Sequence, residues 1–115
     1  TNNAAKSIDR IIDSFPSDQQ QQVRVMMSES LLGVIAQSLL PRSDQPGMVA
    51  ALEVMIAVSA IRNLIRESKS FQIPSVMQTH ARQGMMTYET SIKILLNAGM
   101  ISKTTASSFL QAASA

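Results

Sequence analysis

Apolar residues recur at helical spacing along most of the chain. This pattern predicts a first helix over about residues 3–15, capped by Asn2 or Asn3 and ended by Pro16, and a longer second helix over about residues 18–38. Each helix is expected to bury one face. The chain is therefore predicted to be mainly α-helical, with a helical bundle as its core. Four further helices are expected over about residues 60–67, 74–84, 87–99 and 102–113.

The apolar pattern changes its period between residues 39 and 56. Leu39–Arg42 is predicted to be a short extended arm, and Ser43–Gly47 has the composition of a turn. Residues 48–56 alternate as a strand does but are apolar at almost every position, which is typical of a strand covered on both faces. Because a two-stranded β-hairpin is not stable alone, this one needs cover from the helices or from further strands.

The segment Ala60–Glu67 carries the clearest candidate surface. As a helix it buries its isoleucines and leucine, while Arg62 and Arg66 lie four residues apart on the opposite side and Lys69 follows on the same stripe. Like charges at this spacing do not favour a helix, so the stripe is either a solvated face or a surface that meets a partner. The candidate partner-contact residues are Arg62, Asn63, Arg66 and Glu67.

Composition limits the possible classes of protein. The 115 residues suffice for one modest core. A content of 45% hydrophobic residues is that of a folded chain and argues against disorder. Eight Met and no Trp predict a core that specifies its packing weakly, so we expect a neighbouring surface or domain. The absence of Cys excludes disulfides and thiolate zinc sites. No apolar run approaches the roughly 18 residues that span a bilayer.

The sequence contains no recognisable catalytic motif. A phosphate loop needs two glycines at a fixed spacing before a Lys, and none of the four glycines fits this pattern. His80 is the single histidine, which excludes a metal site built on His and Cys; we expect it at a helix surface with a satisfied nitrogen. Asp9 and Asp13 are expected to be surface charges. We therefore name no catalytic, cofactor-binding or metal-binding residue.

Nucleic acid and the membrane surface are two other kinds of partner for a basic stripe. Nucleic-acid binding is an alternative because Arg62, Arg66 and Lys69 lie together, but a net charge of +2 and almost no aromatic residues argue against it. Membrane-surface binding needs a helix with both a basic face and bulky aromatics, and no helix combines them. We therefore expect neither nucleic acid nor direct membrane insertion.

The octapeptide Ala60–Glu67 resembles the signature of type IV pilus retraction ATPases, the PilT-type motors of the secretion ATPase superfamily. Four other stretches agree with that family in the expected order, so the resemblance extends over nearly the whole chain. The stretches are residues 1–13, which resemble the segment after the family's histidine box, Leu39–Arg42, residues 49–55, and Gly84–Met85 with Thr87. The chain departs from the family at Met48, Ser59, Ser68 and Glu89, where Arg, Pro, Gly and Asp are usual.

The resemblance implies that the chain is the C-terminal portion of a longer motor. That motor would be a cytoplasmic homo-hexamer at the pilus base, peripheral to the inner membrane, which hydrolyses ATP with Mg²⁺ to retract pili in twitching motility. Residues 1–57 would be the end of a RecA-like motor core and residues 58–115 a C-terminal helical subdomain. This portion would have no cofactor of its own and, lacking a phosphate loop, should be inactive alone.

The resemblance also suggests roles for individual residues. Arg62, Asn63, Arg66 and Glu67 would meet a neighbouring subunit or the pilus inner-membrane machinery and transmit force. Thr1 and Asn2 adjoin the family's histidine box and would lie near the nucleotide in the parent protein. An alternative from a different class is a stand-alone helical protein-interaction or regulatory module without ATPase activity.

Overall fold

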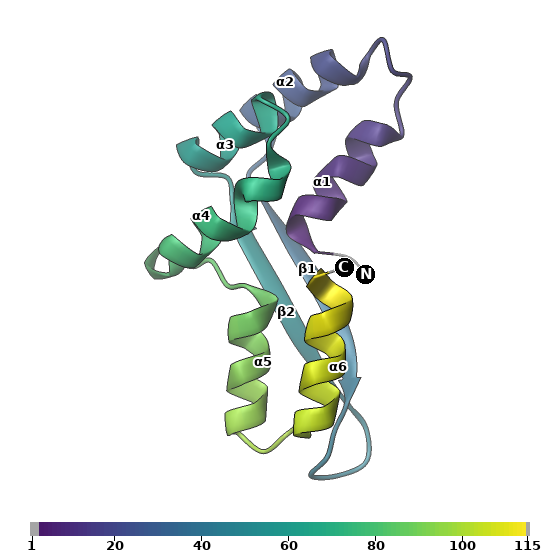
Figure 1. Cartoon of the computed structure of the whole chain (residues 1–115). Coiled ribbons are helices and arrows are strands. Elements are labelled where there is room, and N and C mark those ends of the chain that lie inside the picture. The colour runs from purple at the N-terminus through teal and green to yellow at the C-terminus, as the bar shows by residue number, and fades with distance from the viewer. Residues whose placement is uncertain (1–2, 115) are drawn as a thin grey trace.

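The computed structural model describes residues 3–114, which form six α-helices, two short 3₁₀ helices and one β-hairpin (Figure 1). The prediction of a mainly helical chain with a single hairpin is confirmed. The elements in order are α1 (Ala4–Asp13), α2 (Gln20–Ser30), β1 (Gly33–Pro41), β2 (Met48–Ile56), α3 (Ser59–Arg66), η1 (Ser70–Gln72), α4 (Ile73–Thr79), η2 (Ala81–Gln83), α5 (Tyr88–Asn97) and α6 (Lys103–Ser114).

Side-chain caps begin three of the helices where the sequence predicts them. Asn3 accepts a hydrogen bond from the amide of Lys6 at the start of α1, and Thr87 accepts one from the amide of Thr90 at the start of α5. Ser102 does the same for Thr105 in α6, at 3.1 Å. Such caps satisfy amides that have no partner within the helix.

The apolar stripe of α1 is narrower than its sequence pattern indicates. Ala4, Ala5, Ile8 and Ile12 are buried, as expected. Ile11 and Phe15, which are also apolar, are 50% and 40% exposed. Phe15 lies beyond the end of the helix at Asp13, so the helical period no longer applies to it, and α1 packs on one side only.

The predicted long helix over residues 18–38 is wrong in its second half. The helix α2 ends at Ser30, and the chain continues as strand β1 from Gly33, so the arm expected at Leu39–Arg42 is the end of a nine-residue strand. Pairing with β2 overrides the helical period of these apolar residues because both strands gain a full ladder of hydrogen bonds. Gln19 begins α2 without a side-chain cap.

The two strands pair antiparallel from Gly33 opposite Ile56 to Pro41 opposite Met48. Gly33 lies so close to β2 that a Cβ there would come within 2.7 Å of the Met55 carbonyl oxygen, which explains a glycine at this end of the ladder. The outer edge of β2 is covered, because Val54 exchanges backbone hydrogen bonds with Met86. Strand β1 therefore forms the other edge of the two-stranded sheet.

The helices pack along the hairpin as two groups with separate cores, in a molecule that measures 49 × 30 × 19 Å. In Figure 1, α1 to α4 surround one end of the hairpin and α5 and α6 lie against the other half. Both cores draw residues from either side of position 57, and the division into two domains there stays a prediction. The first core contains Ala4, Ala5, Ile8, Ile12, Met55, Ile61, Ile65, Ile73, Met77 and Met85, and the second contains Ala36, Leu40, Ala51, Tyr88, Ile92, Leu95, Ile101 and Ala106.

Candidate functional site

The predicted charged surface lies on α3, and one of its arginines is used inside the molecule. Ile61 and Ile65 are buried as expected, which fixes the orientation of the helix. The guanidinium of Arg62 is half-buried and donates a hydrogen bond of 2.8 Å from Nη1 to the main-chain carbonyl oxygen of Ser28. Arg62 therefore ties α3 to the last turn of α2 instead of projecting freely into solvent.

The other three predicted contact residues are exposed. Arg66 Nη1 donates to Asn63 Oδ1 at 3.2 Å, so the structure brings these two side chains together. Lys69 does not extend the basic stripe as expected, because α3 ends at Arg66 and Lys69 Nζ lies 3.8 Å from Glu67 Oε2. The free surface is thus made of Asn63, Arg66 and Glu67, and its contact with a partner stays a prediction.

The carboxylate of Glu53 accepts hydrogen bonds from two helices, a role that was not predicted from the sequence. Its Oε1 accepts a hydrogen bond of 2.8 Å from the amide of Ala4, and its Oε2 accepts one of 3.1 Å from the amide of Tyr88. These amides are the first of α1 and α5, so one carboxylate bonds the starts of two helices. A single Glu in an otherwise apolar strand was the available signal, because such a carboxylate must find donors when it is partly buried.

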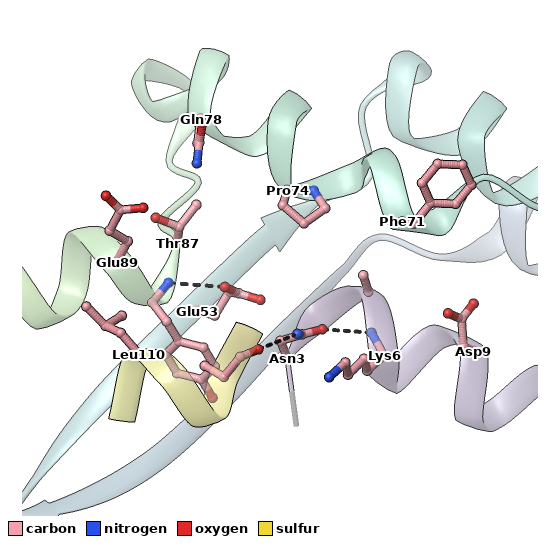
Figure 2. A pocket seen from close by; sticks show the side chains of 13 residues that line it. Asn3, Lys6, Asp9, Glu53, Phe71, Pro74, Gln78, Thr87, Glu89 and Leu110 are labelled. Carbon is pink, nitrogen blue, oxygen red and sulfur yellow. Dashed lines mark hydrogen bonds between the residues drawn. The ribbon is translucent and has the colours of Figure 1, made fainter. Parts of the chain in front are cut away.

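A cavity of about 680 Å³ opens beside Glu53 (Figure 2). Its walls come from α1, from η1 and α4, from the start of α5 and from α6, so both groups of helices contribute. Both apolar and polar side chains line it. Representative lining residues are Asn3, Lys6, Phe71, Thr87 and Leu110. The cavity therefore marks the junction between the two cores.

Tyr88 lies at this junction with its ring almost fully buried. Its ring meets Phe109 edge-to-face, with centroids 5.0 Å apart. The buried hydroxyl has no hydrogen-bond partner among the described residues. Burial raises the pKa of Tyr88, the nearby Glu53 charge adds to the rise, and the Ser38 hydroxyl opposes it without reaching hydrogen-bond geometry.

The histidine and the acidic side chains of the described residues are dispersed. Within residues 3–114 no group of three or more His, Asp or Glu side chains is placed to hold a metal ion. His80 is half-buried and its Nδ1 lies 2.8 Å from the Val76 carbonyl oxygen, as expected for a satisfied histidine. Asp9 is exposed and accepts a hydrogen bond from Ser70. Thr1 and Asn2, predicted to adjoin a nucleotide, lie outside the described residues.

No helix in the described range 3–114 has the length and apolar character needed to cross a membrane.

No protein-family model matches the chain.

Curated proteins and a solved structure match most of the chain. It is 50% identical over 101 residues to a twitching motility protein of Neisseria gonorrhoeae, covering 88% of this chain and 27% of that protein. It is 48% identical over 103 residues to the type IV pilus retraction ATPase PilT of Pseudomonas aeruginosa, covering 90% of this chain and 30% of that one. The crystal structure of the pilus retraction motor PilT with bound ADP superposes with a TM-score of 0.78 and 42% identity, over 92% of this chain and 29% of that one.

The chain thus spans less than a third of the length of these relatives. The matched fold includes the hairpin and its helices, since the superposition extends over 92% of the chain. About half of the residues are identical over roughly 100 positions. Proteins that share only a fold do not reach this sequence identity, so the similarity indicates common ancestry. Over this stretch the chain is therefore homologous to the PilT-type type IV pilus retraction ATPases.

Proposed function

We propose that this chain is part of an ATP-driven motor that retracts type IV pili and so powers twitching motility. The observation that carries the proposal is the identity of 50% and 48% to proteins named for twitching motility and pilus retraction. In this proposal the intact protein is a hexamer in the cytoplasm, and it acts against the pilus machinery at the inner membrane.

Nucleotide chemistry is assigned to another part of the intact protein. The solved relative holds ADP, but the four glycines of this chain do not form a phosphate loop. We therefore place the ATP and Mg²⁺ site outside the described residues. The division into a motor-core end over residues 1–57 and a helical subdomain over residues 58–115 belongs to the same proposal.

The proposed role of this part is contact with a neighbouring subunit or with the pilus machinery, and transmission of force. Asn63, Arg66 and Glu67 are exposed at the end of α3 and bear charges of both signs, which suits a polar interface. Arg62, one turn earlier on the same helix, fixes α3 to α2 through Ser28. Contact and support are therefore divided between neighbouring residues of one helix.

The test is made in the intact gene, with twitching motility and ATP hydrolysis measured together. A double variant with Arg66→Ala and Glu67→Ala should abolish twitching while the purified motor still hydrolyses ATP. The matched control removes two exposed charges elsewhere, Asp18→Ala with Lys103→Ala, and should twitch normally. Normal twitching by the first variant would remove the proposed surface.

A second outcome addresses the function itself. An intact protein that lacks a phosphate loop and hydrolyses no ATP would contradict the motor proposal and favour the stand-alone interaction module. In that case the charged surface of α3 would have to be examined by its binding partners, not by motility.

A further inference from the structure

Glu53 occupies the point on β2 where one core gives way to the other. Side chains alternate along a strand, so Ala51, Glu53 and Met55 face the same side of the hairpin. Ala51 belongs to the core under α5 and α6, and Met55 belongs to the core under α1, α3 and α4. An acidic side chain therefore separates two apolar contacts on one continuous strand face.

Each oxygen of this carboxylate binds a helix from a different group. The amide of Ala4 donates to Oε1 and the amide of Tyr88 donates to Oε2. The first amides of a helix lack partners within it, and the helix dipole favours negative charge at this end. A carboxylate suits the position because both of its oxygens only accept hydrogen bonds.

Glu53 is not needed to begin either helix, because each has its own cap. Asn3 caps α1 through the amide of Lys6, and Thr87 caps α5 through the amide of Thr90. Glu53 instead connects α1 to α5. A second, longer contact of 3.5 Å runs from Asn3 Nδ2 at the start of α1 to the Ala113 carbonyl oxygen in α6.

We propose that Glu53 is a positioning residue that fixes the orientation of α5 and α6 relative to α1. The 680 Å³ cavity beside it is the space that changes when this connection is released. The proposal concerns the relative placement of the two groups of helices, not the folding of either one. Resting on the function proposed above, it makes this carboxylate a point through which movement of α1 reaches α5 and α6.

The first test uses the 115-residue chain with Glu53→Gln. The amide keeps the volume but has one accepting oxygen, so one of its N–H groups must face a helix amide and a connection is lost. We expect at least about tenfold faster hydrogen exchange at Ala4 or Tyr88, because a bond to a charged acceptor is removed. Spin labels at the exposed positions Asp13 and Ser108 should report a broader distance distribution.

The matched control is Thr87→Ala, which removes the cap of α5 but leaves Glu53 in place. Faster exchange is expected at Thr90, with the distribution of label distances unchanged. An unchanged distribution in Glu53→Gln would overturn the proposal. If that variant does not fold, Glu53→Asp, which keeps the charge but shortens its reach, is measured by the same criterion.

The second test introduces Glu53→Gln into the intact protein and measures retraction and ATP hydrolysis. We expect ATP hydrolysis to continue while less retraction occurs per ATP consumed. Retraction and hydrolysis that remain coupled as in the unmodified protein would overturn the role of Glu53 in transmitting movement. An intact protein that hydrolyses no ATP would instead contradict the motor function, and the distance measurements on the 115-residue chain would still decide the positioning role.

Discussion

Arg62 and Ser28 are joined by a hydrogen bond of 2.8 Å from the guanidinium Nη1 to a main-chain carbonyl oxygen. Since α2 ends at Ser30, this carbonyl has no amide one turn further along the helix to pair with. A positive charge is also favourable at the C-terminal end of a helix. Arg62 therefore caps α2 from a different helix and stabilises the packing of α2 against α3.

The two arginines of α3 should differ in their effect on stability. Arg62→Ala leaves the Ser28 carbonyl unpaired and should lower the free energy of unfolding by about 1–3 kcal/mol. Arg66→Ala removes an exposed side chain and should change it by less than about 0.5 kcal/mol. Urea denaturation of the two variants measures the difference. Equal effects would show that the bond to Ser28 contributes nothing.

Ser68 should be replaceable by Gly with a gain in stability. Its φ of 61° lies in the left-handed region, at the position where α3 ends and Lys69 donates back to the Leu64 carbonyl oxygen. A side chain there costs about 1 kcal/mol or more, so Ser68→Gly should raise the free energy of unfolding by about 0.5–1 kcal/mol.

The control for this change is Ser75→Gly, at an exposed position inside α4. There glycine only loosens a helix and should lower the free energy of unfolding by up to about 1 kcal/mol. Thermal denaturation of both variants tests the opposite signs. A loss of stability in Ser68→Gly would mean that the serine has a favourable contact that outweighs its backbone strain.

Stability should fall in alkali because of Tyr88. Burial raises the pKa of its phenol above the ordinary value of about 10, so the unfolded chain loses this proton first as the pH rises. The contribution is fully present below about pH 10 and is lost as the pH climbs towards the pKa of the folded state. Tyr88→Phe should show a weaker dependence on pH above about 10.

Phenolate absorbance measures this directly, because the chain has one Tyr and no Trp. The native protein should ionise at higher pH than the same protein in urea. At neutral pH, Tyr88→Phe should be neutral or stabilising by up to about 1 kcal/mol, since the buried hydroxyl has no partner to lose. Identical titrations in the folded and unfolded states would contradict the assigned cause.

The open edge of the hairpin should cause self-association. The amides of Leu52 and Val54 point away from β1, because they donate to Ser91 Oγ and to the Met86 carbonyl oxygen. In an antiparallel pair the residues opposite them then also point their amides outward. These residues are Gln37 and Ile35, whose amides lie at the outer edge of β1. In the described part of the chain nothing pairs with that edge. Unpaired strand edges with apolar side chains recruit further strands.

Ile35→Lys should reduce this association without unfolding the chain, since Ile35 is 73% exposed. The control Ile94→Lys places the same charge at a 54% exposed position on α5 and should leave association unchanged. Sedimentation equilibrium over a range of concentrations measures both. A monomer at every concentration before mutation would show that the two-stranded sheet needs no further strand.

The local elements that could be predicted are those whose signals lie within a few residues. The caps at Asn3, Thr87 and Ser102 were predictable because a side chain there bonds an amide three residues away. The helix at Ala60–Glu67 was equally clear, because its apolar period agrees with its burial. The homology to PilT-type motors was also predicted from the sequence, since the octapeptide and its flanking stretches lie in a fixed order.

Tertiary structure decided what distant residues do to one another. Residues 33–38 were predicted to continue a helix, yet they form part of strand β1 because β2 offers them a full ladder of hydrogen bonds. In the sequence Arg62 has the pattern of a surface charge, but in the structure it bonds the end of α2. Glu53 is an isolated polar residue in the sequence, but in the structure its two oxygens accept hydrogen bonds from the starts of two helices. The sequence by itself determined the local elements and the family, because these depend on neighbouring residues. Only the tertiary structure decided which charges are structural, because that depends on where helices end in space.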